Sequence, residues 1–427
     1  MRLVGKAAEK DIMPKMDAYP IDLTRTALYH FAHTLVWTAM LLYQIQCVGL
    51  TPLQLVLVGT TLEATVFLCE IPTGIIADVY SRRLSMIIGV FLIGIAYLVA
   101  GVFPTFAMLL LSNVLWGLGY TCTSGAYEAW LVDELGQACA GEAFVRAGQV
   151  ARAVAIVAIP VSAVLGSLHL ALPILVGAGG VLLTGVFLLL WMPEHGFAPT
   201  PTEERITWQT FGETFLDGLR VLRGQPTLRR MLAVGVCYGL FSEAWDRLWQ
   251  THLLHTIGLP QVLSVQPIVW FSLIAIGDMG MGIVVGEVVR RRLNMQSGTA
   301  MGRGLFWMTA TMVVGLVVYG VTTHFLVAML AFFAFTSARG LTGPVYSTWA
   351  NMHIDSRVRA TVLSMQSQTD AIGQIVGGPP LGALGERRLS LAFLASAAML
   401  SPALWLLRRA ERSQPGEHTD EVVAADA

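Results

Sequence analysis

The chain has 427 residues, of which 55% are hydrophobic and 13% charged, and its formal net charge at pH 7 is -1. A soluble protein of this length carries more ionic surface, so the composition indicates an all-α polytopic protein embedded in a lipid bilayer. The near-neutral charge gives no reason to expect a nucleic-acid partner. The five cysteines lie in or beside apolar runs without a CxxC spacing, which argues against a disulfide framework or a metal site.

The N-terminal residues 1–20 mix lysines with acidic residues and contain no apolar run. No cleavable signal peptide is therefore expected, and the first membrane span must itself direct insertion.

Apolar runs then follow one another along the chain. A hydrocarbon core about 30 Å thick requires about 20 apolar helical residues. The runs predict twelve transmembrane helices, and Gly and Pro residues mark several of the short connections. The predicted spans are 28–48, 54–76, 84–104, 107–127, 148–168 and 171–192 in the first half, and 229–251, 266–288, 300–320, 324–346, 362–384 and 389–407 in the second.

The spans predict four regions. Residues 1–193 and 229–410 each form a six-helix bundle, 194–228 form a cytoplasmic linker, and 411–427 form a disordered acidic tail. Apolar residues of the linker recur every three or four positions, namely Trp208, Phe211, Phe215, Leu219 and Leu222. This spacing predicts a helix that lies in the membrane interface or, alternatively, one that binds a partner.

Basic residues are concentrated in the connections on the side of both termini. Arg387 and Arg388 fall on the opposite side, and Arg152 and Arg247 fall within spans. Because Lys and Arg are enriched in cytoplasmic loops, this distribution predicts that both termini are cytoplasmic.

Two segments at equivalent connections resemble each other. Residues 74–84 read GIIADVYSRRL and residues 283–293 read IVVGEVVRRRL, aligned without a gap. The match predicts a duplicated six-helix unit. An acid at the end of one helix and arginines at the start of the next can latch one conformation, although the arginines could instead only anchor the loop. The predicted gate residues are Glu70, Gly74, Asp78, Arg82, Arg83, Glu287, Arg291 and Arg292.

The first of these segments, GIIADVYSRR, resembles the G-x-x-x-D-x-x-x-R-[RK] loop motif of the major facilitator superfamily. The preceding EIPTG, at 70–74, is similar to the form in many bacterial drug-efflux members. The resemblance implies two pseudo-symmetric six-helix bundles around a central cavity, and alternating access by rocking of the bundles.

Two further spans depart from motifs of this family. The span 107–127 matches its R-x-x-x-G pattern, but Asn113 stands at the arginine position, so proton handling through that arginine is not expected. The span 148–168 resembles the antiporter motif through its small residues and Pro160, while Ile159 and Ala163 occupy glycine positions.

Each ionisable residue inside a span raises the free energy of membrane insertion by about 2.5 to 3.5 kcal/mol. Such a residue therefore needs a partner, a cavity or a function. Glu243, Asp246 and Arg247 are predicted to share a helical face, where Arg247 neutralises one acid and leaves the other to bind protons. A closed salt-bridge triad is the alternative. The full set of proton-coupling candidates is Asp370, Glu243, Asp246, Glu63, Asp278 and His33.

Asp370 lies on a polar stretch with Gln366 and is the preferred acid to face the cavity, the alternative being a purely structural pairing. The tryptophans on spans that line the cavity in the resembling family imply an aromatic, weakly polar pocket. The candidates for lining it are Trp37, Asn113, Arg152, Trp245, Arg247, Trp249, Trp270, Tyr346 and Gln366.

These features predict a secondary active transporter of the plasma membrane that exports small amphipathic or aromatic compounds against proton entry. Proton-coupled uptake of a small metabolite is the alternative. The chain lacks HExxH, GxSxG and a nucleotide-binding GK[ST] loop, so no enzyme activity, catalytic residue, cofactor or metal is expected. We expect a monomer.

Overall fold

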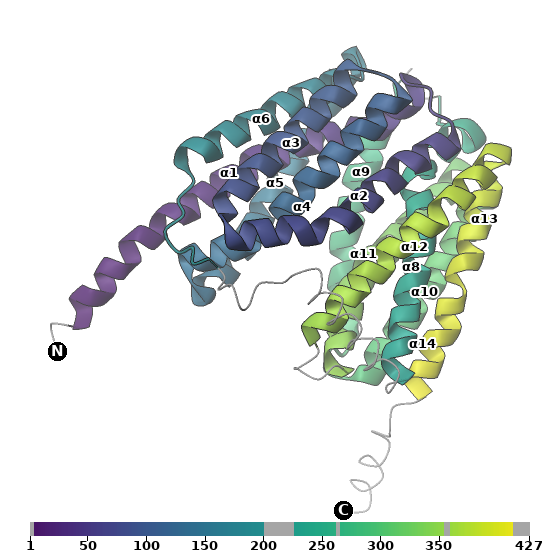
Figure 1. The fold of residues 1–427 in the computed structure, drawn as a ribbon. Helices are drawn as coiled ribbons and strands as arrows, with labels where there is room; N and C mark the ends of the chain where they lie inside the picture. Colours follow the sequence, from purple (N-terminus) through teal and green to yellow (C-terminus); the bar gives the residue numbers. More distant parts are fainter. Residues whose placement is uncertain (1–3, 200–225, 262–264, 354–358, 413–427) are drawn as a thin grey trace, which may run out of the picture. The chain divides into compact units, whose positions relative to one another are not determined.

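The structure is a computed structural model that describes residues 4–199, 226–261, 265–353 and 359–412. Within these ranges the chain forms long helices and no strand, which confirms the predicted all-α class (Figure 1). The helix expected around 208–222 and most of the tail at 411–427 lie outside the described residues.

Three helices of the first half begin where a short polar side chain accepts a hydrogen bond from a free backbone N–H. Thr51, Ser81 and Thr105 cap α2, α3 and α4 in this way. The connection before α5 passes through Gly136, whose φ of 78° suits a residue without a Cβ. The helices are α1 (Val4–Gln46), α2 (Pro52–Val79), α3 (Arg82–Val102), α4 (Phe106–Leu135), α5 (Gln137–Leu168) and α6 (Leu172–Trp191).

The second half contains a π-helical turn, η2 (Leu253–Ile257), directly after its first helix. The last predicted span, 389–407, is divided at Ser401, because Pro402 has no N–H to continue the helical ladder. The other helices are α8 (Pro226–His252), α9 (Pro267–Arg292), α10 (Gly298–Val321), α11 (Phe325–His353), α12 (Arg359–Arg387), α13 (Leu389–Leu400) and α14 (Pro402–Arg412).

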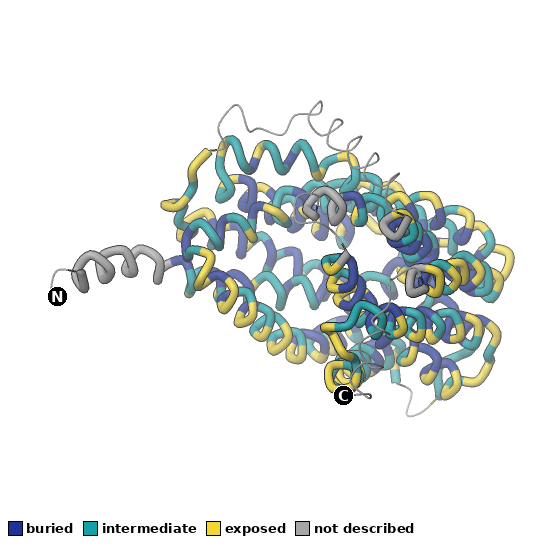
Figure 2. The backbone as a smooth tube through the Cα atoms, turned by 90° about the horizontal axis from the view of Figure 1, so that it is seen from below, coloured by how far each residue is buried: buried dark blue, intermediate teal, exposed yellow. Residues whose placement is uncertain are grey.

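Nine segments in the described part of the chain are long and apolar enough to cross a membrane. Exposed residues recur along the helices rather than only at their ends (Figure 2). Large apolar side chains such as Val164, Leu183 and Leu330 are among them. Such surfaces suit helices that face lipid.

The chain divides into two compact units. The first comprises Met1–Trp208 and Leu259–Gly277, and the second comprises Gln209–Gly258 and Asp278–Ala427. In the first unit α3 packs against α4 and α6, and α1 packs against α5 and α6. In the second unit α8 packs closely against α12, where a Cβ on Gly377 would lie 2.1 Å from the Leu240 carbonyl oxygen.

Candidate functional site

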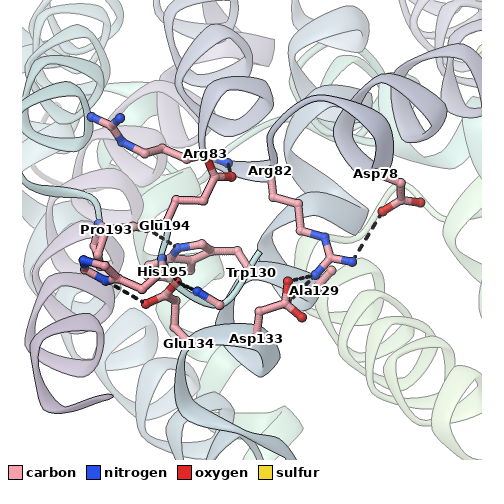
Figure 3. Close-up of polar contacts among 11 residues, drawn as sticks. Asp78, Arg82, Arg83, Ala129, Trp130, Asp133, Glu134, Pro193, Glu194 and His195 are labelled. Carbon is pink, nitrogen blue, oxygen red and sulfur yellow. Dashed lines mark hydrogen bonds and ion pairs between the residues drawn. The ribbon is translucent and has the colours of Figure 1, made fainter. Parts of the chain in front are cut away.

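The connection from α2 to α3 holds the predicted gate motif. Asp78 is in the last turn of α2, and Arg82 is the first residue of α3. The guanidinium of Arg82 lies 3.6 Å from the Asp78 carboxylate, and it also binds the Asp133 carboxylate and the Ala129 carbonyl oxygen on α4 (Figure 3). Arg82 thus joins three helices of the first unit.

Glu194, directly after α6, binds the start of α3. Its carboxylate accepts hydrogen bonds from the Ser81 hydroxyl (2.7 Å) and the Arg83 backbone N–H (2.8 Å). A carboxylate at this position is stabilised by the positive end of the helix dipole. The Arg83 side chain binds the Leu189 carbonyl oxygen at 2.8 Å. The loop is therefore held from α6 as well as from α4.

The end of α4 fixes the segment 193–196. The buried Glu134 carboxylate accepts the backbone N–H groups of His195 at 2.6 Å and Gly196 at 2.8 Å, and the Trp130 indole N–H donates to the Pro193 carbonyl oxygen at 2.7 Å (Figure 3). Together with the contacts of Glu194, these bonds connect the segment after α6 to the α2–α3 loop.

The repeated segment in the second half has a different geometry. Glu287 binds Arg291 at 2.6 Å and Arg290 at 2.7 Å, all within α9, which ends at Arg292. The arrangement expected for the motif, with its arginines at the start of the following helix, is therefore not found here, because α10 starts only at Gly298, close to the predicted span 300–320. The acid-to-arginine pair at i and i+4 recurs, but here it lies along one exposed helix.

The remaining predicted gate residues, Glu70 and Gly74, lie on α2. Glu70 is exposed, and a Cβ on Gly74 would meet no atom within 4 Å. Gly74 is thus not required for close helix packing in this conformation.

A cavity of about 550 Å³ lies within the second unit, between α8, α11 and α12. Asp370, Gln366 and Tyr346, which were predicted from the sequence, line it. The Asp370 carboxylate accepts a hydrogen bond of 2.9 Å from the Gln374 side chain. The wall also contains Tyr238, Phe241 and Arg339, so the cavity combines aromatic surface with one acid and one base.

Two ion pairs replace the predicted triad on α8. Glu243 binds Arg247 at 2.8 Å, and both are largely buried. Asp246 binds Arg339 of α11 at 2.5 Å and 2.7 Å. The expectation that Arg247 leaves one of these acids without a partner is wrong. Arg339 is a further arginine within a predicted span, and the distribution of charges along the sequence did not single it out.

Aromatic and polar side chains of α1, α3 and α4 meet around one hydroxyl group in the first unit. The Tyr97 hydroxyl accepts hydrogen bonds from the indole N–H groups of Trp37 (2.9 Å) and Trp116 (2.8 Å). It lies 2.8 Å from Nδ1 of His33. Since an indole can only donate, the tyrosine proton must point to His33, whose Nδ1 accepts it.

Most other candidates are not among the residues that line the second-unit cavity. Trp245, which was expected to line it, is 3% exposed and packs on Phe335 in the aromatic core of the second unit. Asp278 accepts a hydrogen bond from the Thr336 hydroxyl, and the Asn113 amide donates to the Leu109 carbonyl oxygen of its own helix. Among the remaining candidates, the Arg152 side chain on α5 is exposed. Three others are half-buried: Glu63 on α2, Trp249 on α8 and Trp270 on α9.

The sequence of residues 25–378 matches the Major Facilitator Superfamily. The chain belongs to the major facilitator superfamily. It is 21% identical over 360 residues to the uncharacterized MFS-type transporter YxaM of Bacillus subtilis (strain 168), covering 83% of this chain and 85% of that protein.

Solved structures of other transporters share the fold of this superfamily member. A crystal structure of the nucleoside transporter NupG superimposes with a TM-score of 0.72 at 14% identity, covering 93% of this chain and 99% of that one. A POT family transporter in complex with a thioalcohol-conjugated peptide gives 0.71 at 13% identity, covering 92% and 96%. This superfamily member is thus a multi-pass membrane transporter of small molecules.

Proposed function

We propose that this transporter exports small amphipathic or aromatic compounds across the plasma membrane and is driven by proton entry. The second-unit cavity supports this assignment most directly. Its aromatic residues offer stacking surface to a planar compound, and Asp370 offers a carboxylate that can bind either a proton or a cationic group. The efflux-type EIPTG sequence before the gate motif agrees with export.

Arg339 gives the cavity a means of responding to protonation. It interacts electrostatically with Asp370 while its hydrogen bonds go to Asp246. A proton on Asp370 removes one of three attractions on Arg339 and leaves those of Asp246 and Glu243 in place. Asp370 can therefore exchange protons without leaving an unpaired arginine in the membrane.

Accumulation of lipophilic antibiotics and dyes in cells with and without this protein tests the proposal. Cells that contain the protein are expected to accumulate less of at least one compound, and a protonophore is expected to abolish the difference. The variant Glu142→Gln, which changes an exposed acid at the start of α5, serves as the expression control. Unchanged accumulation of every compound would contradict export.

Proton-coupled uptake of a metabolite is the second candidate. Arg339 in the cavity wall favours it, because its positive charge attracts an anionic metabolite even while its two parallel hydrogen bonds go to Asp246. The nucleoside transporter NupG and the POT family transporter in complex with a peptide have the same fold as this chain, and this fold is compatible with uptake. Protein-dependent accumulation of an anionic metabolite that collapses with protonophore would favour uptake over export.

A further inference from the structure

A second, mainly apolar groove lies outside the cavity discussed above. It has a volume of about 570 Å³ and runs between α9, α10 and α11 of the second unit. Small residues of α11 leave room for it, since Ala334, Ser337 and Ala338 recur on one face. Large apolar side chains form the remaining walls, among them Val285, Leu293, Trp307, Leu330 and Phe333.

Contacts between the helices mark the two ends of the groove. Near the middle of α9, Asp278 accepts the Thr336 hydroxyl of α11 at 2.5 Å. At the end of α9, Leu293 packs against Gly304 of α10, where a Cβ would lie 3.0 Å from the leucine side chain. The groove thus extends along the half of α9 that leads to the face assigned to the cytoplasm by the distribution of basic residues.

The groove is open to the surroundings of the helices. Trp307 and Leu330, which line it, are 67% and 72% exposed. Val288 also lines it and is exposed, and its neighbours Ile283 and Val284 on α9 are exposed apolar residues as well. In a membrane such a surface faces acyl chains.

Arg292 lies at the cytoplasmic end of the groove and lines it. Arg290 and Arg291 are bound to Glu287, whereas Arg292 is exposed and forms no ion pair with any residue that the structure describes. A guanidinium in this state is available to a phosphate group, with which it forms charge-assisted hydrogen bonds.

We propose that this groove binds an anionic phospholipid of the cytoplasmic leaflet, with an acyl chain between α9 and α11 and its phosphate on Arg292. The dimensions agree with such a ligand. The stretch 281–293 of α9 that lines the groove rises about 18 Å at 1.5 Å per residue, and one leaflet of hydrocarbon is about 15 Å thick. A basic side chain at the headgroup level and an apolar channel below it match the two parts of a lipid.

Binding of lipids to the purified full-length protein tests this inference without any transport assay. Phosphatidylglycerol and phosphatidylcholine with the same acyl chains are titrated, and bound lipids are counted by native mass spectrometry. The wild-type protein is expected to bind phosphatidylglycerol more tightly. Arg292→Gln should weaken phosphatidylglycerol binding about fivefold, the effect of one basic residue near an anionic headgroup, and leave phosphatidylcholine binding unchanged.

Two further variants separate a specific site from general attraction. Arg290→Gln also removes one positive charge from α9, but the Arg290 side chain is bound to Glu287. This variant should therefore weaken phosphatidylglycerol binding less than Arg292→Gln. Ala334→Trp fills the groove from an exposed position and should reduce binding of both lipids.

Equal affinity for the two lipids, equal weakening by Arg290→Gln and Arg292→Gln, or full binding by a monodisperse Ala334→Trp variant would each overturn the proposal. Arg292→Gln changes only an exposed side chain, so its comparison with Arg290→Gln decides the question even if Ala334→Trp does not fold.

Discussion

At the scale of single residues, the hydroxyl of Tyr97 organises the polar side chains of the first unit. It accepts two indole N–H groups and donates to Nδ1 of His33. This arrangement requires a neutral His33 with its proton on Nε2, because a proton on Nδ1 would place two donors against each other. The sequence suggested His33 and Trp37 as functional residues, but nothing in it linked them to Tyr97, about sixty positions away.

Tyr97→Phe is expected to lower the stability of the protein, because it leaves two indole N–H groups and a histidine nitrogen without their partner. An unsatisfied buried polar group costs about 1–3 kcal/mol, and the indole of Trp37, which is 44% exposed, should contribute least. Thermal unfolding in detergent measures the effect. Tyr29→Phe is the matched control, since Tyr29 stacks on the same histidine through its ring. Equal unfolding temperatures for the two variants would show that the hydroxyl of Tyr97 does not organise the cluster.

At the scale of helices, the positions of the spans were predictable, whereas their full extents and the partners of their charged ends were not. Bilayer thickness sets the length that an apolar run needs, and each of the twelve predicted spans overlaps a described helix, the last of them divided at Ser401. Some helices are longer than predicted, since α1 begins at Val4 and α5 at Gln137. Three acids bind the α2–α3 loop or the segment 193–196 next to it, and all are distant in sequence from the α2–α3 motif: Asp133 and Glu134 on α4, and Glu194 after α6. Their pairing depends on how α3, α4 and α6 pack.

The repeated segment in the second half also shows that sequence similarity did not predict where a helix ends. Its residues align with the first segment without a gap, yet α9 continues through all three arginines while α3 starts at Arg82. Ser81 and Glu194 stabilise the helix start in the first half. The aligned residue in the second half is Arg290, which instead binds Glu287 one turn earlier. Local capping, rather than the motif itself, decides where the helix ends.

The two acids that bind Arg82 should contribute unequally. Asp133 is 25% exposed and joins α4 to α3, while Asp78 is 50% exposed and lies 3.6 Å from the guanidinium. Asp133→Asn should therefore destabilise the protein by about 1.5–3 kcal/mol, as expected for a hydrogen bond to a charged group. Asp78→Asn should cost about 0.2–1 kcal/mol, as expected for an exposed pair. Thermal unfolding of the two variants side by side gives the order, and a larger loss for Asp78→Asn would reverse this assignment.

At the scale of the whole molecule, the two compact units differ in what they contain. The first unit has the tightly bound α2–α3 loop, and the second has the cavity with Asp370 and Arg339. Membership of the superfamily and the duplicated sequence explain why the units are related. Under the function proposed above, the first unit would control opening and the second would couple transport to protons.

Proton movement in proteoliposomes tests the central proposal most directly. With a transported compound identified from the accumulation panel, addition of that compound on one side of the membrane should drive protons across in the opposite direction in the wild-type protein. Asp370→Asn should abolish this coupled proton flux while exchange of the compound across the membrane continues. Compound-driven proton flux that persists in Asp370→Asn, or its absence from the wild-type protein, would contradict proton-coupled export through this cavity.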